Sequence, residues 1–237
     1  MEFQSSTSTL RSRDEVQAEQ TRFLMKVYNW MGGGLAATGI VAYLVANSQT
    51  AVNIIFANRM IPIGLFIVEI ALVGALAGWI MKMRARTAAT VFFAYALLNG
   101  ITFSSIFIIY TRSSITSAFI ITAGTFGAMS LYGAATKKDL SSWGSFLFMG
   151  LIGIVIAFVV NIFLQSSIVA WVASCIGVLV FTGLTAYDTQ KILRMNIIGN
   201  EGTEEDTKEA IIGALTLYLD FINLFLMILH LMGGRRD

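Results

Sequence analysis

Three acidic residues lie in stretches of sequence that are otherwise strongly apolar. They are Glu69 in LFIVEIALV, Asp188 in FTGLTAYDTQKIL and Asp220 in TLYLDFINLFLM. If these stretches are membrane helices, an ionised carboxylate near the bilayer centre costs at least about 2.5 kcal/mol. Each acid then needs a proton, a partner or a function. Carboxylates in such a place can carry protons or bind a hard cation such as Ca²⁺.

Helical spacing places polar side chains beside two of these acids. Residues three and four apart share one face of a helix, which groups Thr216, Asp220 and Asn223 on one stripe and Asp188 with Thr185 on another. Asp188 lies near the end of its expected helix. The chain enters the next expected helix, which carries Asp220, from the same side of the membrane. The two carboxyl groups are therefore expected to meet if their helices are neighbours.

A meeting of Asp188 and Asp220 would have specific consequences. Two carboxylates in a low dielectric cannot both ionise cheaply, so the pair is expected to share a proton. With the proton the groups bond to each other; without it they repel or attract a cation, and the two acids are the predicted metal ligands. Arg84 or Arg86, just after the second apolar block, would moderate the repulsion, and Glu69 is interpreted as a third cavity residue. The alternative for each acid is a structural hydrogen bond to a neighbouring helix.

The composition is typical of a polytopic membrane protein. Of 237 residues, 56% are hydrophobic and only 13% are charged, whereas a soluble domain carries about a quarter charged residues. The lipid bilayer is thus the first expected partner. A net charge of +2 gives no sign of nucleic-acid binding. One cysteine, Cys175, and one histidine, His230, leave little basis for a catalytic constellation built on histidine. No enzyme and no resident cofactor are therefore expected.

Seven apolar blocks are long enough to span a bilayer, which needs roughly 20 helical residues. The expected spans are 27–46, 61–81, 88–111, 117–136, 145–164, 168–190 and 210–232. They make an all-α transmembrane domain over 23–237, preceded by a polar arm over 1–22.

The basic residues predict the orientation. Lys and Arg concentrate in the arm and in the second, fourth and sixth connectors, so the N-terminus is expected in the cytoplasm. Seven spans then put the C-terminus outside. A re-entrant last segment would return it to the cytoplasm, which Arg235 and Arg236 would suit better.

The two aspartate segments resemble the signatures of a known family. AYDTQKI at 186–192 and ALTLYLDFINLFL at 214–226 are similar to those of the transmembrane Bax inhibitor motif family, in its bacterial inner-membrane branch. VYNWMGGGL at 27–35, SSIFIIYT at 104–111 and GAMSLYGAATKKDLSSWG at 127–144 extend the resemblance over essentially the whole chain.

The resemblance implies a fold and a function. The fold is a seven-helix bundle in which the last helix lies between two layers of three. The function is a pH-sensitive Ca²⁺ leak controlled by a di-aspartyl sensor, here Asp188 and Asp220. The family's arginine at the end of the second helix matches Arg84 or Arg86 loosely, with Arg84 favoured, and its second-helix acid matches Glu69. Eukaryotic members are linked to suppression of cell death, and one bacterial relative to an AAA protease of the membrane.

Three other functions remain open from the residues. A proton-coupled secondary transporter would use the same titratable acids. A regulatory protein would contact other membrane proteins through the arm or the acidic EGTEEDTKE segment. An intramembrane aspartyl protease would use an aspartate dyad, but the Gly-x-Gly-Asp pattern expected of such proteases is absent from the sequence.

Overall fold

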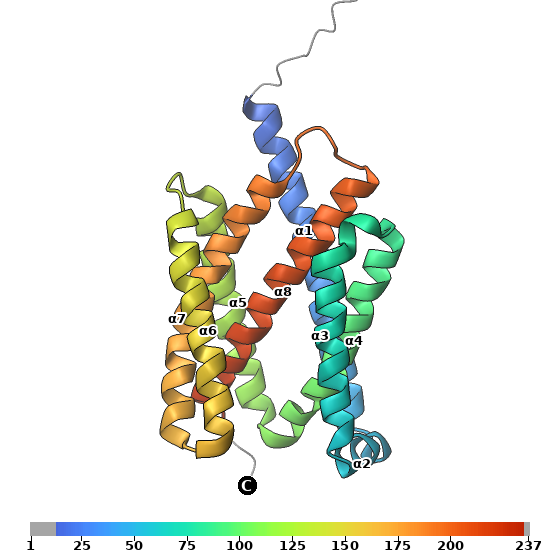
Figure 1. The fold of residues 1–237 in the computed structure, drawn as a ribbon, viewed down its shortest axis with the longest axis vertical. Coiled ribbons are helices and arrows are strands. Elements are labelled where there is room, and N and C mark those ends of the chain that lie inside the picture. The colour runs from blue at the N-terminus through green and yellow to red at the C-terminus, as the bar shows by residue number, and fades with distance from the viewer. Residues whose placement is uncertain (1–12, 235–237) are drawn as a thin grey trace, which may run out of the picture.

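The computed structural model describes residues 13–234 of the chain, and these residues are almost entirely helical (Figure 1). They form eight α-helices and one 3₁₀ turn, with short connectors. The elements are α1 (Arg13–Ala46), α2 (Gln49–Ala57), α3 (Met60–Trp79), η1 (Ile80–Lys82), α4 (Ala85–Ile109), α5 (Arg112–Ala135), α6 (Ser141–Leu164), α7 (Ser167–Met195) and α8 (Glu204–Met232).

Hydroxyl side chains begin four of these helices. The side chains of Ser48, Thr111, Ser166 and Thr203 each accept a hydrogen bond from the backbone N–H three residues later, at the starts of α2, α5, α7 and α8. Such caps satisfy N–H groups that the helix itself leaves unpaired. A hydroxyl residue in the sequence thus marks the start of each of these four helices.

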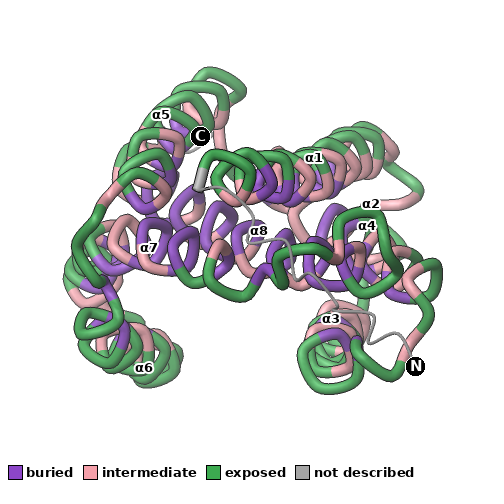
Figure 2. Tube along the Cα trace, turned by 90° about the horizontal axis from the view of Figure 1, so that it is seen from above, coloured by how far each residue is buried: buried purple, intermediate pink, exposed green. Residues whose placement is uncertain are grey.

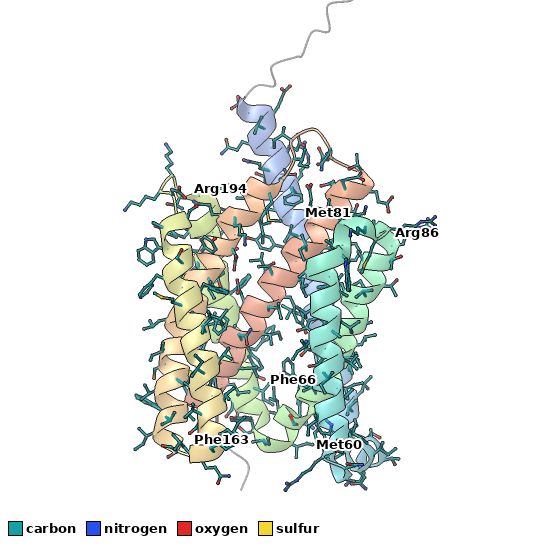
Figure 3. All side chains as sticks on the ribbon, in the orientation of Figure 1. Met60, Phe66, Met81, Arg86, Phe163 and Arg194 are labelled. Atoms are coloured by element: carbon teal, nitrogen blue, oxygen red, sulfur yellow. The ribbon has the colours of Figure 1, made fainter. Side chains whose placement is uncertain are left out.

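Seven helices are long and apolar enough to cross a membrane, so the chain is a multi-pass membrane protein, as predicted. The last of them, α8, is continuous over 29 residues, or about 43 Å at 1.5 Å per residue. A re-entrant last segment is therefore not observed. Apolar side chains such as Met60, Phe66 and Phe163 project outward from the bundle, as lipid-facing residues do (Figure 3).

The helices exceed the expected spans at several ends. The described part of the predicted arm, residues 13–22, is helical and continues directly into the first span. The connector expected after that span contains the short helix α2, and α8 begins inside the expected polar loop. Hydropathy identifies only the apolar part of a helix, which lies in lipid. The hydrogen-bonded helix can continue beyond it into polar residues, so the observed helices are longer than the predicted spans.

The predicted arrangement around the last helix is confirmed. Figures 1 and 2 show α1, α3 and α4 on one side of α8 and α5, α6 and α7 on the other. α8 packs against α1, α4, α5 and α7, while α3 packs mainly on α4 and α6 on α7. Most of α8 is accordingly buried, and Tyr218 at its middle is completely so. The acid at position 220 is therefore carried by the most enclosed helix of the bundle.

Candidate functional site

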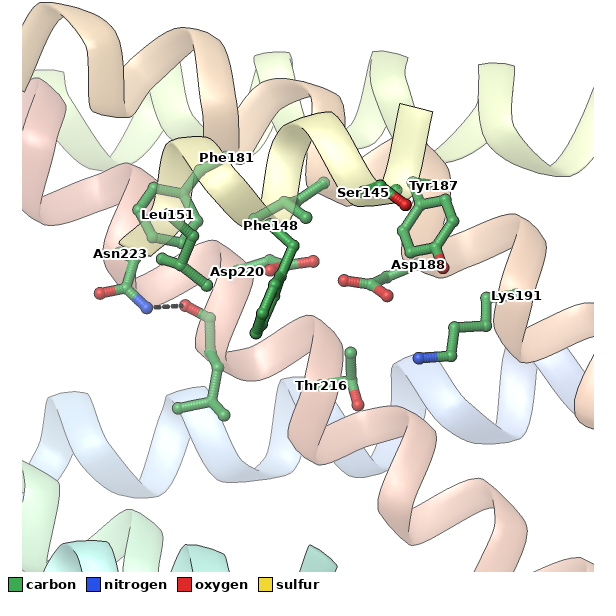
Figure 4. Close-up of a pocket in the computed structure, with 13 residues that line it drawn as sticks. Ser145, Phe148, Leu151, Phe181, Tyr187, Asp188, Lys191, Thr216, Asp220 and Asn223 are labelled. Atoms are coloured by element: carbon green, nitrogen blue, oxygen red, sulfur yellow. Dashed lines mark hydrogen bonds between the residues drawn. The ribbon is translucent and has the colours of Figure 1, made fainter. Parts of the chain in front are cut away.

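The structure brings the two predicted aspartates together. Asp188 of α7 and Asp220 of α8 face each other across the contact between these helices, close enough for their charges to interact (Figure 4). Both are buried, with 8% and 5% of their surface exposed. Oδ2 of Asp220 has no hydrogen-bond partner among the described residues. Because an ionised carboxylate can only accept hydrogen bonds, the pair can bond internally only if one group carries a proton.

The pair lies in the wall of a cavity of about 540 Å³. Its lining comes from α6, α7 and α8: Gly144, Ser145, Phe148, Leu151, Phe181, Leu184, Tyr187, Asp188, Lys191, Thr216, Leu219, Asp220 and Asn223. A water needs only about 30 Å³, so a hydrated ion fits. Within residues 13–234, no group of three or more His, Cys, Asp and Glu side chains is placed to hold a metal ion. The site therefore offers a cation two carboxylates, with water to complete its shell.

Two of the three predicted supporting residues reach this cavity. Thr216 and Asn223 line it, and each donates a side-chain hydrogen bond to the carbonyl four residues earlier in α8, at 3.0 and 2.8 Å. Those bonds leave their side-chain oxygens able to accept from a ligand or water. Thr185 is fully buried, donates to the carbonyl of Phe181 at 2.8 Å and does not line the cavity. It supports the shape of α7 rather than the site.

The structure corrects the expectation of a modulating arginine. Arg84 and Arg86 are exposed at the start of α4 and do not line the cavity, and Arg86 points away from the bundle in Figure 3. They belong to the layer opposite the one that carries Asp188. Lys191, one turn after Asp188 on α7, lines the cavity instead and brings a positive charge to the wall that carries the acid pair. The three-residue spacing between Asp188 and Lys191 was the sequence signal for this contact.

Glu69 does not join the acid pair either. It is buried on α3, where Thr102 of α4 donates a hydrogen bond to its Oε1 at 2.7 Å. It does not line the cavity, whose walls come from other helices. The expectation of a third cavity residue is thus corrected in favour of the alternative, a hydrogen bond that joins α3 to α4.

Several lining residues were not predicted from the sequence, and three of them form one wall of the site. Ser145 and Gly144 of α6 and Tyr187 of α7 form the wall beside Asp188. A Cβ on Gly144 would lie 2.6 Å from the ring of Tyr187, closer than carbon atoms pack. The glycine lets the two helices approach, and this brings α6 close enough to enclose the acid pair. Its position in SSWGSF carried no pattern that distinguishes it from other glycines.

The loop from α7 to α8 is tied to α1. Lys26 donates to Asp206 Oδ2 at 2.9 Å, and the backbone N–H of Gly199 donates to Glu19 Oε1 at 2.6 Å. Asp206 and Glu19 are both buried. This loop joins the two helices that carry the aspartates. The contacts therefore hold the end of α7 and the start of α8 in place against α1.

A second polar contact holds the connector between α5 and α6. The backbone N–H of Ser141 donates to Asp139, and Arg194 forms an ion pair with the same carboxylate at 2.8 Å. These hydrogen bonds, with the positive charge, lower the pKa of Asp139 to about 2. Asp139 is therefore ionised at any physiological pH, in contrast to the shared proton expected of the buried pair.

Comparisons with known proteins agree with this architecture. Residues 20–237 match the family described as "Inhibitor of apoptosis-promoting Bax1". The chain is 49% identical over 235 residues to the inner membrane protein YbhL of Escherichia coli, covering 99% of both chains. It is 45% identical to a protein of Borreliella burgdorferi, over 92% of this chain and 94% of that one. A protein of Rickettsia prowazekii is 42% identical over 98% of each. With a match of this extent over the helices that carry both aspartates, the chain belongs to the family of Bax1 inhibitor-like membrane proteins.

Proposed function

We propose that the protein is a pH-sensitive calcium leak, gated by the protonation of the pair formed by Asp188 and Asp220. The observation that carries the proposal is the burial of both carboxyl groups, face to face, in the wall of a large cavity within the bundle. Oδ2 of Asp220 is buried and has no hydrogen-bond partner among the described residues. A proton or a cation is what can satisfy it.

The gate follows from the two states of this pair. With one proton, the carboxyl groups hydrogen-bond and hold α7 against α8. Without it, two unit charges about 4 Å apart repel by about 4 kcal/mol at an effective dielectric of 20. That repulsion is relieved if the helices separate or if a divalent cation binds between the groups. Calcium suits this exchange because it takes oxygen ligands in irregular geometry.

The unbroken helices favour a leak over a coupled transporter. Transporters commonly bind substrate where membrane helices are interrupted, whereas α7 and α8 are continuous helices of 29 residues each. In this proposal the protein catalyses no reaction and holds no resident cofactor. Its partners are lipid, protons and Ca²⁺.

The proposed location is the bacterial inner membrane, with the N-terminus in the cytoplasm. The location is inferred from the name of the Escherichia coli relative, and the orientation from the basic residues at the end of the bundle where α1 begins. The tied loop between α7 and α8 then lies on the cytoplasmic side. A contact with a membrane protease, which the family resemblance suggests, would also be made there.

The experiment is a calcium-flux assay on the purified protein in liposomes with a step in pH. The wild-type protein is expected to release more Ca²⁺ as the pH rises through the range in which the pair loses its proton. Asp220→Asn keeps the size of the side chain but cannot ionise, so its flux should not respond to pH. Asp139→Asn is the matched control, because this exposed acid is ionised throughout. A pH response in Asp220→Asn equal to that of the wild type would refute the proposal.

A further inference from the structure

One face of α8 is left uncovered by the neighbouring helices. Along the buried part of this helix, the half-exposed residues recur at alternating steps of four and three, which places them on a single stripe. They are Ile212, Thr216, Leu219, Asn223, Leu226 and His230. The opposite face is buried against α1, α4 and α5. Three residues of this stripe, Thr216, Leu219 and Asn223, line the cavity of the acid pair. We call this cavity, together with the stripe that continues from it, the lateral groove.

This groove opens sideways, between the two outermost helices. In Figure 2, α3 and α6 stand apart on the same side of α8, one belonging to each layer. α3 contributes no residue to the cavity of the acid pair, whose lining comes from α6, α7 and α8. At the cavity, the surface of the bundle carries exposed apolar side chains such as Phe148. In a bilayer, an apolar helix surface of this kind faces lipid.

The residues that line the groove are apolar where they are exposed and acidic where they are buried. Phe148 and Leu151 of α6 and Leu219 of α8 give an apolar wall toward the opening, and Phe148 has 58% of its surface exposed. Asp188 and Asp220 line the same cavity (Figure 4) and are far more buried, with 8% and 5% of their surface exposed. A ligand from the bilayer would meet hydrocarbon first and carboxylates last.

The charges of the residues that line the cavity favour a ligand with a positively charged head group. Among the described residues, Lys191 is the only basic side chain that lines the cavity, against two acids. Asp220 Oδ2 is buried without a partner, and Asn223 and Thr216 add side-chain oxygens that can accept. An ammonium group brings three N–H donors and one positive charge. It therefore satisfies acceptors that a neutral or anionic head group would leave unpaired.

We propose that this lateral groove binds an amphiphilic primary amine from the bilayer. Its ammonium group lies between Asp188 and Asp220, and its alkyl chain runs along Phe148, Leu151 and Leu219 toward the lipid. The ligand uses the same acid pair as the proposed calcium leak, but it arrives from the membrane, and its binding is measurable whether or not calcium passes.

The test is photo-crosslinking in phosphatidylcholine liposomes. Dodecylamine and dodecanol, each with a diazirine in the chain, are compared on the full-length protein, and the labelled residues are mapped by mass spectrometry. The amine is expected to label the groove residues of α6 and α8 about tenfold more than the alcohol, the ratio that one charge-assisted hydrogen bond gives. In Asp188→Asn/Asp220→Asn, labelling by the amine should fall to the level of the alcohol. Equal labelling by amine and alcohol in the wild type would overturn the proposal.

A second variant tests the groove without touching the acids. Phe148→Trp narrows the groove and should reduce labelling by the amine, whereas Phe146→Trp is its matched control, because Phe146 lies on the same helix, is 66% exposed and does not line the cavity. Labelling that is reduced equally by both substitutions, or by neither, would also refute the site.

Discussion

The close contact between Gly144 and Tyr187 predicts a large difference between two glycine substitutions on α6. In Gly144→Ala, the new Cβ would lie 2.6 Å from the Tyr187 ring, about 1 Å inside the separation at which carbon atoms pack. In Gly153→Ala, on the same helix, the new Cβ meets nothing within 4 Å. Both substitutions gain the same helix propensity, about 1 kcal/mol.

The magnitude follows from that comparison. Gly153→Ala should leave the free energy of unfolding unchanged or raise it by up to about 1 kcal/mol. Overpacking a helix contact costs about 1–3 kcal/mol, so Gly144→Ala should be less stable than Gly153→Ala by about that amount. Because Tyr187 lies beside Asp188 in the cavity wall, Gly144→Ala should also shift the pH response of calcium release.

The assay is reversible unfolding in mixed micelles, followed by tryptophan fluorescence, for both variants and the wild type. A double variant, Gly144→Ala with Tyr187→Ala, identifies the cause, since removal of the ring should cancel the penalty of the added methyl group. If Gly144→Ala and Gly153→Ala were equally stable, or if the loss persisted without the ring, the proposed contact between α6 and α7 would be refuted.

Two further predictions concern charge. Lys191→Gln removes the positive charge that lines the cavity beside the acid pair. The pH midpoint of calcium release should therefore move upward, by about one unit if the lost interaction is worth about 1.4 kcal/mol. An unchanged midpoint would show that Lys191 does not act on the pair. For Asp139, a pKa near 2 in the folded protein lies below the unfolded value of about 3.9, so its stabilising effect is complete above pH 4 and is lost as the pH falls toward 2. The thermal stability of Asp139→Asn relative to wild type should therefore be the same at pH 6 and pH 8, and a difference that grows between these values would contradict the assigned contacts.

The sequence predicts well those features that depend on order along the chain. Asp220 and its stripe partners Thr216 and Asn223 follow from the helical repeat, and all three line the cavity. The meeting of Asp188 with Asp220 follows because consecutive antiparallel helices start and stop at the same end of the bundle. The spans follow from hydropathy, with errors of a few residues where polar turns continue a helix.

Features that depend on the packing of distant helices could not be predicted in the same way. Arg84 and Arg86 lie at the correct end of the bundle but in the opposite layer, and Glu69 bonds within its own layer to Thr102. Hydropathy gives the depth of a residue in the membrane but not its angle around the bundle axis. The contact of Gly144 with Tyr187 likewise requires knowledge of which helices are neighbours.

The central place of α8 has a consequence for how the protein is made. Apart from α8, the described helices of the two layers make few direct contacts, among them α1 with α7, α4 with α5 and a hydrogen bond between Tyr28 of α1 and Ser130 of α5. The helix that unites them is also the last of the described helices in chain order, so it leaves the ribosome after the other seven. Until it enters the membrane, the nascent chain consists of two half-bundles, each exposing the face against which α8 will pack. The described bundle is therefore complete only after α8 has inserted between the two layers, and the acid pair can form only at that step.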